Sequence, residues 1–156
     1  GTGAKDVFDL LAATSALEVP VVMMTYWNPI ERYGVENFAR SMKDAGGSGV
    51  ITPDLTIEES NEWASAATSH EINRIYVVAP STSETRILAV TSQCSGFVYA
   101  ASLMGVTGTR NSVSGDARNL VARIRSTSDL PVAVGLGVSN AEQAHEVAQQ
   151  HSLKII

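Results

Sequence analysis

Two glycine-bearing turns, each directly after a short apolar run, are the strongest chemical signal in this chain. Residues 97–101 form the first run, and the loop after it reaches Gly108. Residues 131–134 form the second run, which is followed by Gly135 and Gly137. Glycine allows the backbone to approach an anion closely with its N–H groups exposed. Either turn alone also fits an ordinary strand-to-helix connection, but the pair predicts a phosphate site.

The composition indicates one ordinary hydrophobic core. The 156 residues are 44% hydrophobic and 17% charged, with a formal net charge of −5. This acidic balance disfavours nucleic acids and anionic membranes as partners. Cys94 is the only cysteine, which excludes an internal disulfide and a cysteine metal cluster. Without a signal-peptide pattern or a membrane-length apolar run, we expect a cytoplasmic protein with no membrane segment.

The elements that must position these turns alternate between strand and helix. Short apolar runs without polar alternation predict buried parallel strands at residues 21–24, 50–51, 75–79, 97–101 and 132–134. Apolar residues at helical spacing separate them, as in the pairs Phe38 with Met42, Trp63 with Ala67, Ile87 with Val90 and Leu120 with Ile124. A further helix is expected over residues 6–13, and capping boxes predict helix starts at Thr56 and Ser139. The pattern predicts an α/β fold.

Within this class, a barrel is favoured over a doubly wound sheet. No G-x-G-x-x-G opens a helix after the first predicted strand, as a dinucleotide site would require. A complete (β/α)8 TIM barrel takes about 250 residues. We therefore expect residues 1–156 to form a single, incomplete TIM barrel domain with parallel strands, truncated at both ends.

The other ionisable residues give weaker signals. Asp54 follows the strand at residues 50–51, where a barrel would hold a catalytic carboxylate. The three histidines, His70, His145 and His151, have no convincing set of metal-ligand neighbours and are predicted to lie on the surface. No metal site is predicted.

Five segments, in this order and spacing, resemble the α chain family of tryptophan synthase. They are residues 20–30, 51–55, 78–82, 96–108 and 131–139. The resemblance extends over residues 6–149 and is most specific at Ser102-Leu-Met-Gly-Val-Thr-Gly108. It implies a (β/α)8 barrel, of which this chain would hold about strands 3 to 7.

The resemblance also implies an activity, the retro-aldol cleavage of indole-3-glycerol phosphate to indole and glyceraldehyde 3-phosphate. The two catalytic carboxylates of the family would lie upstream of Gly1, so no catalytic residue is expected in this chain, and alone it should be inactive. No cofactor is expected here. The family passes indole to a partner β chain, which carries pyridoxal phosphate.

Family positions suggest roles for individual residues. The phosphate would be bound at Gly108, Gly137, Gly135 and Thr107, and the rest of the substrate at Tyr99, Tyr26, Met24 and Leu136. The strand residues among these could instead pack in the core. Leu136 replaces a frequent phenylalanine, and Leu103 a frequent arginine, which puts an aromatic contact with indole and the anchoring of the loop in doubt.

A partner interface is implied at Asp54, Asn28 and Pro29. For Asp54 the family position suggests coupling to the β chain, with catalysis and a plain helix-entry role as the alternatives. Asn28 and Pro29 could instead form a solvated turn. For the whole chain, the alternatives to a lyase are a non-catalytic binding or regulatory module for a β-type partner and another phosphate-binding barrel enzyme.

Overall fold

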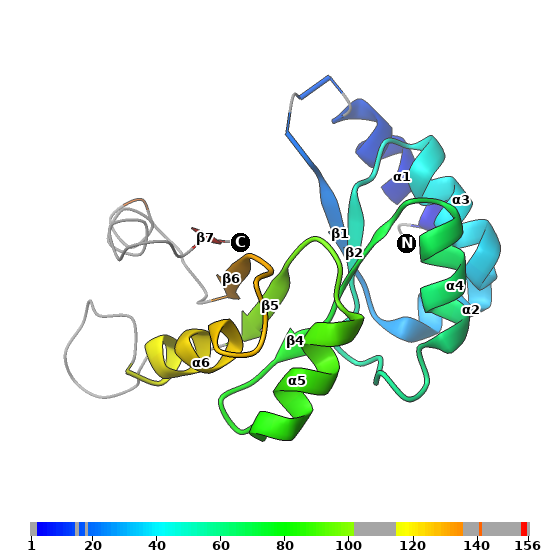
Figure 1. Cartoon of the computed structure of the whole chain (residues 1–156). Helices are drawn as coiled ribbons and strands as arrows, with labels where there is room; N and C mark the ends of the chain where they lie inside the picture. Colours follow the sequence, from blue (N-terminus) through cyan, green and yellow to red (C-terminus); the bar gives the residue numbers. More distant parts are fainter. Residues whose placement is uncertain are drawn as a thin grey trace. The chain divides into compact units, whose positions relative to one another are not determined.

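The computed structural model describes residues 3–14, 16–17, 19–101, 115–135, 141 and 154–155. The chain divides into two compact units, Gly1–Tyr76 and Val77–Ile156. Each unit holds a sheet whose strand pairs are all parallel, and helices follow the strands along the chain (Figure 1). The predicted α/β class with parallel strands is therefore confirmed.

The first unit contains a three-stranded sheet in the order β1-β2-β3. Its strands are β1 (Val22–Met24), β2 (Gly49–Ile51) and β3 (Asn73–Ile75). Its helices are α1 (Ala4–Ala13), α2 (Trp27–Tyr33), α3 (Val35–Asp44) and α4 (Asn61–Ser69). In register, Met24 at the end of β1 lies beside Ile51 of β2, which lies beside Ile75 of β3. The three strands thus end at one level and present a common carboxyl edge.

Aromatic side chains join the helices of this unit. The rings of Phe8 and Phe38 lie 5.5 Å apart between centroids, and Phe38 lies 6.1 Å from Trp63. Tyr33 from α2 packs edge-on against both phenylalanines. Trp63 is fully buried. The predicted helical pairs, Phe38 with Met42 and Trp63 with Ala67, are confirmed as buried. Each ring contact adds about 0.5–1.5 kcal/mol beyond burial.

The second unit contains a four-stranded sheet in the order β4-β5-β6-β7. Its strands are β4 (Val77–Val78), β5 (Val98–Ala101), β6 (Val132–Gly135) and β7 (Lys154–Ile155), and its described helices are α5 (Glu84–Gln93) and α6 (Gly115–Arg125). Burial alternates along β5, where Val98 and Ala100 are buried and Tyr99 and Ala101 are half-buried. Tyr99 therefore lies on the less covered face of this sheet.

Several predicted boundaries were wrong. The single strand expected at residues 75–79 is two strands, because the backbone leaves the first sheet at Tyr76 and β4 joins the second. Thr56 does not begin a helix: its hydroxyl bonds the Glu59 carboxylate at 2.9 Å within a turn, and α4 starts at Asn61. The first helix begins at Ala4, two residues earlier than expected.

One residue between α4 and β3 has an unusual backbone conformation. Glu71 has φ of 55°, in the left-handed region that side chains with a Cβ disfavour. Its carboxylate accepts a hydrogen bond of 2.9 Å from Lys43 Nζ, and this contact lowers the pKa of the exposed Glu71 carboxyl. The stabilisation from this pair is present above the pKa of the unfolded carboxyl and is lost as the pH falls through the lowered folded pKa.

We expect Glu71→Val to lower the thermal midpoint by about 2–6 °C relative to Glu71→Asn. Both variants remove the charge, so their difference isolates the backbone, since asparagine tolerates left-handed φ and a β-branched side chain does not. Thermal unfolding followed by circular dichroism measures it. Equal midpoints would mean that Glu71 is not held in this conformation in solution.

Candidate substrate and phosphate site

Tyr99 and Gly135 form the closest pair among the predicted site residues. Tyr99 pairs in register with Ala133, and Gly135 lies two residues further along β6 on the same face. A Cβ built on Gly135 would lie 1.9 Å from the Tyr99 hydroxyl oxygen and 2.4 Å from Cζ. The phenol ring therefore leans toward the carboxyl edge over Gly135, where only glycine leaves it room.

The close approach gives Gly135 a definite role. The structure places this residue at the end of β6, where the Tyr99 ring lies over it, and its predicted part in the phosphate site stays a prediction. Tyr99 itself is half-buried, with its hydroxyl at the level where β5 and β6 end. A phenol at this level can line a cavity and offer one hydrogen bond to a ligand.

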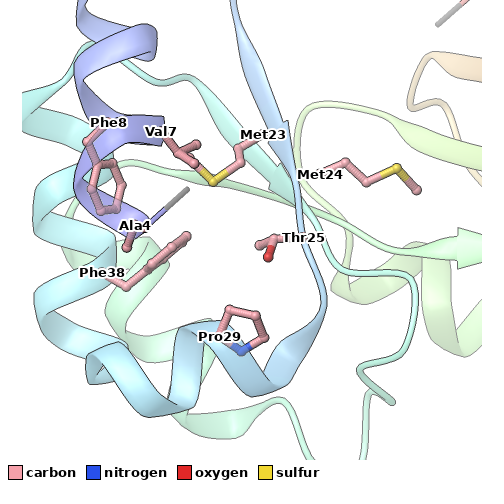
Figure 2. A pocket seen from close by; sticks show the side chains of 9 residues that line it. Ala4, Val7, Phe8, Met23, Met24, Thr25, Pro29 and Phe38 are labelled. Atoms are coloured by element: carbon pink, nitrogen blue, oxygen red, sulfur yellow. The ribbon is translucent and has the colours of Figure 1, made fainter. Parts of the chain in front are cut away.

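Met24 and Tyr26 lie at the carboxyl edge of the first unit. Met24 is 54% exposed and Tyr26 is 66% exposed, which is high for such large apolar side chains. Figure 2 shows Met23 pointing toward the helices while Met24 points to the opposite side of β1. Neither Met24 nor Tyr26 is buried among the described residues, and their assignment to the substrate site stays a prediction.

Asp54 holds the start of α2. Its two carboxylate oxygens lie 2.9 and 3.1 Å from the backbone nitrogen of Trp27, which donates to them. The N-cap residue of α2 is Tyr26, whose side chain makes no capping hydrogen bond. Asp54 thus supplies, from the loop after β2, the acceptor that an Asp or Ser would normally supply locally. Its negative charge also suits the positive end of the helix.

The hydrogen bonds between Trp27 and Asp54 join the segments that follow β1 and β2 at the carboxyl edge of this sheet. Thr25 donates its backbone N–H to the Ile51 carbonyl at 3.1 Å, so the segments leaving β1 and β2 also lie side by side. The exposed Asp54 carboxylate is thereby fixed at the start of α2, directly after the exposed residue Tyr26. These hydrogen bonds fix the start of α2, and they show that Asp54 acts at the entry to this helix.

Asn28 and Pro29 lie in the first turn of α2, not in a loop as predicted. Both are exposed. Proline is accepted there because the first N–H groups of a helix have no acceptor within the helix. The expected loop is therefore the start of a helix, and the assignment of both exposed residues to a partner interface stays a prediction.

An apolar pocket of about 220 Å³ lies on the helix side of β1. Figure 2 shows Val7 and Phe8 of α1, Phe38 of α3 and Met23 around it. Met24 and Pro29 also contribute to its lining, but Tyr26 and Asp54 do not. Of the two predicted substrate residues of this unit, the pocket therefore includes Met24 and not Tyr26.

Four predicted site residues lie outside the described part of the chain: Leu136, Thr107, Gly108 and Gly137. Leu103, the second predicted capping box at Ser139, and two of the histidines, His145 and His151, lie outside it as well. The third histidine, His70, is only partly exposed, and its Nε2 lies 2.6 Å from Glu36 Oε1. Sequence reasoning missed this pair because 34 residues separate its members.

Two further residues at the edge were not singled out from the sequence. The backbone N–H of Trp27 is the donor from which the Asp54 carboxylate accepts. Thr52, at the end of β2, is buried, and its hydroxyl has no hydrogen-bond partner in the described ranges. Only the position of a polar residue directly after an apolar run could have indicated Thr52.

The described residues contain no group of three or more His, Cys, Asp or Glu side chains arranged to hold a metal ion. None of the helices within the described ranges has the length and apolar character needed to cross a bilayer.

Parallel strands followed by helices, with candidate residues at the carboxyl ends of strands within each unit, define a parallel α/β protein. The chain belongs to the tryptophan synthase alpha chain family, whose profile matches residues 1–156. The family resemblance seen in the sequence is therefore confirmed.

Curated relatives agree with this assignment. The alpha chain of Streptomyces avermitilis is 57% identical over 136 residues, covering 87% of this chain and 49% of the relative. That of Acidothermus cellulolyticus is 49% identical over 156 residues, covering 100% of this chain and 58% of the relative. The chain thus spans about half the length of the curated relatives it matches.

Solved structures support the fold. A Mycobacterium tuberculosis tryptophan synthase structure aligns with a TM-score of 0.87 and 46% identity, covering 99% of this chain and 59% of that one. A tryptophan synthase complex from Pyrococcus furiosus aligns with a TM-score of 0.84 and 28% identity, covering 99% and 62%. The fold class, an incomplete (β/α)8 barrel, is thereby confirmed.

Proposed function

We propose that this chain is part of a tryptophan synthase α chain, a carbon–carbon lyase that cleaves indole-3-glycerol phosphate to indole and glyceraldehyde 3-phosphate. The observation that carries the proposal is the family match over all 156 residues. In the reaction, the bond between indole C3 and the adjacent glycerol carbon breaks, C3 gains a proton, and the hydroxyl on that carbon loses one to become the aldehyde. These transfers need general acid and base groups.

The part proposed for this chain is to bind and orient the substrate. Tyr99, seated on Gly135, would form one wall of the cavity for the indole and glycerol parts, with Met24, Tyr26 and Leu136 as further lining residues. Thr107, Gly108, Gly135 and Gly137 would anchor the phosphate, which supplies binding energy remote from the reacting carbon. The catalytic carboxylates are expected outside residues 1–156.

The proposed partner is a tryptophan synthase β chain that carries pyridoxal phosphate and receives the indole. Asp54, Asn28 and Pro29 are all exposed and lie together at the start of α2, which is compatible with a docking face. The α chain itself is proposed to need no cofactor, and a cytoplasmic location is our expectation for the complex.

A chimera tests the proposed reaction. Residues 1–156 would replace the aligned segment of the Acidothermus cellulolyticus alpha chain, which covers this chain completely. We expect the folded chimera to release indole from indole-3-glycerol phosphate and residues 1–156 alone to release none. A second chimera with the aligned Nocardia farcinica segment, 50% identical to this chain over 148 residues, controls for the grafting itself. If only the control were active while both were folded, the proposed function would be wrong.

In the active chimera, Gly108→Val and Gly137→Val should each weaken binding of indole-propanol phosphate roughly tenfold. Each valine would intrude where backbone N–H groups are proposed to approach the anion. Calorimetric titration measures the affinity, and Ala141→Val, at an exposed position, is the matched control. Unchanged affinity in both folded glycine variants would exclude the two-turn phosphate site.

A further inference from the structure

Arg123 of α6 holds the loop between β4 and α5 with three groups of its guanidinium. Nη1 donates to the Pro80 carbonyl at 3.0 Å, and Nη2 donates to the Thr82 carbonyl. Nε donates to the carboxylate of Glu84, the first residue of α5. The Arg123 side chain is only 24% exposed. One partly buried side chain thus ties α6 to a segment about 40 residues earlier in the chain.

The rest of this loop is held locally. Ala79 donates its backbone N–H to Thr82 Oγ1 at 3.1 Å, and Thr82 returns a backbone bond to the Ala79 carbonyl at 2.9 Å. Ser83 caps α5 by accepting from Arg86. These bonds shape the turn, but they do not fix it against another element. The bonds from Arg123 do so, through two carbonyls that point toward α6.

The loop leaves the sheet beside the Tyr99 site. Val77 pairs with Tyr99 and Val78 with Ala100, so the next residue, Ala79, lies at the level of Ala101. Ala101 in turn pairs with Gly135, over which the Tyr99 ring leans. The turn that begins at Ala79 therefore borders the same carboxyl edge, one strand away from Tyr99.

We propose that Arg123 is a positioning residue of the substrate site, which acts by fixing the 79–83 loop as the wall beside Tyr99. The proposal rests on the proposed function for the identity of the ligand, an indole-bearing phosphate ester. Lysine cannot replace arginine here, because one ammonium group cannot reach two carbonyls and a carboxylate in the geometry of the planar fork. A role of charge alone would be satisfied by either residue.

The test uses the chimeric alpha chain with Arg123→Met and Arg123→Lys. We expect both to weaken binding of indole-propanol phosphate about three- to tenfold, with kcat changed less than twofold, because the wall orients the ligand but does not react. Amide exchange at Thr82 should accelerate in both variants. Arg118→Met, an exposed arginine on the same helix, should change neither quantity.

A purely structural role predicts a different pattern. Ile124→Val, at a fully buried position next to Arg123 on α6, lowers stability while keeping the Arg123 guanidinium. If it weakened binding as much as the Arg123 variants at an equal loss of thermal stability, the proposal would be overturned. Restoration of affinity by Arg123→Lys, or unchanged affinity in both variants, would also overturn it.

The same experiment separates this proposal from the proposed reaction. If the parent chimera binds the analogue without releasing indole from the substrate, the proposed lyase activity fails while the Arg123 variants still test the wall. If the parent releases indole and the Arg123 variants bind normally, only the positioning role fails. If the parent does not bind the analogue, both are wrong.

Discussion

Gly135→Ala is expected to lower kcat/KM for indole-3-glycerol phosphate about a hundredfold in the chimeric alpha chain. The single added methyl carbon would lie 1.9 Å from the Tyr99 hydroxyl oxygen and 2.4 Å from Cζ, so the ring must leave its seat. Displacing a cavity wall by about 1 Å is enough to disturb the orientation of a reacting substrate. Steady-state indole release is the measurement.

Two companion variants make this result specific. Tyr99→Phe removes the hydroxyl but leaves Cζ in the path of the new methyl group, so adding it to Gly135→Ala should not restore folding stability. Adding Tyr99→Leu to Gly135→Ala removes the ring and should restore folding stability. Gly3→Ala is the control, because the only atom near its Cβ would be the Asp6 carboxylate oxygen at 3.9 Å, an ordinary contact. Full activity in folded Gly135→Ala would show that the ring is not seated as the structure has it.

The sequence predicted the features whose cause is local. The helical spacing of Phe38 with Met42 and of Leu120 with Ile124 identifies faces that are indeed buried. Four of the five apolar runs coincide with β1, β2, β5 and β6, whereas β3 contains Asn73 and Arg74 and has no apolar run of its own. Tyr99 could be named from the family position, yet its contact with Gly135 depends on the register of β5 with β6, which one sequence does not specify.

Features that depend on distant parts of the chain could not be predicted. Pro29 was predicted to lie in a loop because Asn-Pro favours turns. It lies instead in α2, whose first N–H group donates to Asp54, a residue 27 positions after Trp27. The run at residues 75–79 looked continuous because its composition does not reveal that two sheets share it. Arg123 gave no signal, since the carbonyls it binds are backbone atoms.

Asp54→Ala is expected to reduce the stimulation of indole release by a β chain more than it reduces the basal rate. The carboxylate is exposed, lies at the proposed docking face and holds the start of α2 through Trp27. Its loss should cost about 1–2 kcal/mol of stability, as for other helix caps, and about 1–3 kcal/mol of coupling free energy. Rates with and without saturating β chain from Acidothermus cellulolyticus give the coupling, and thermal unfolding gives the stability.

Asp54→Asn separates the two contributions, because the amide oxygen can still accept from the Trp27 N–H while the charge is gone. If Asp54→Asn keeps the stability but loses the stimulation by the β chain, the charge itself contacts the partner. If the variant keeps both the stability and the stimulation, the coupling to the β chain depends on the orientation of α2. Asp9→Ala is the control and should change neither the stability nor the stimulation measurably. Among the described residues, the exposed Asp9 carboxylate pairs only with Lys5, within α1. A catalytic Asp54 would instead abolish basal and stimulated rates together in both variants, and an inert helix-entry residue would alter stability with the ratio of the two rates unchanged.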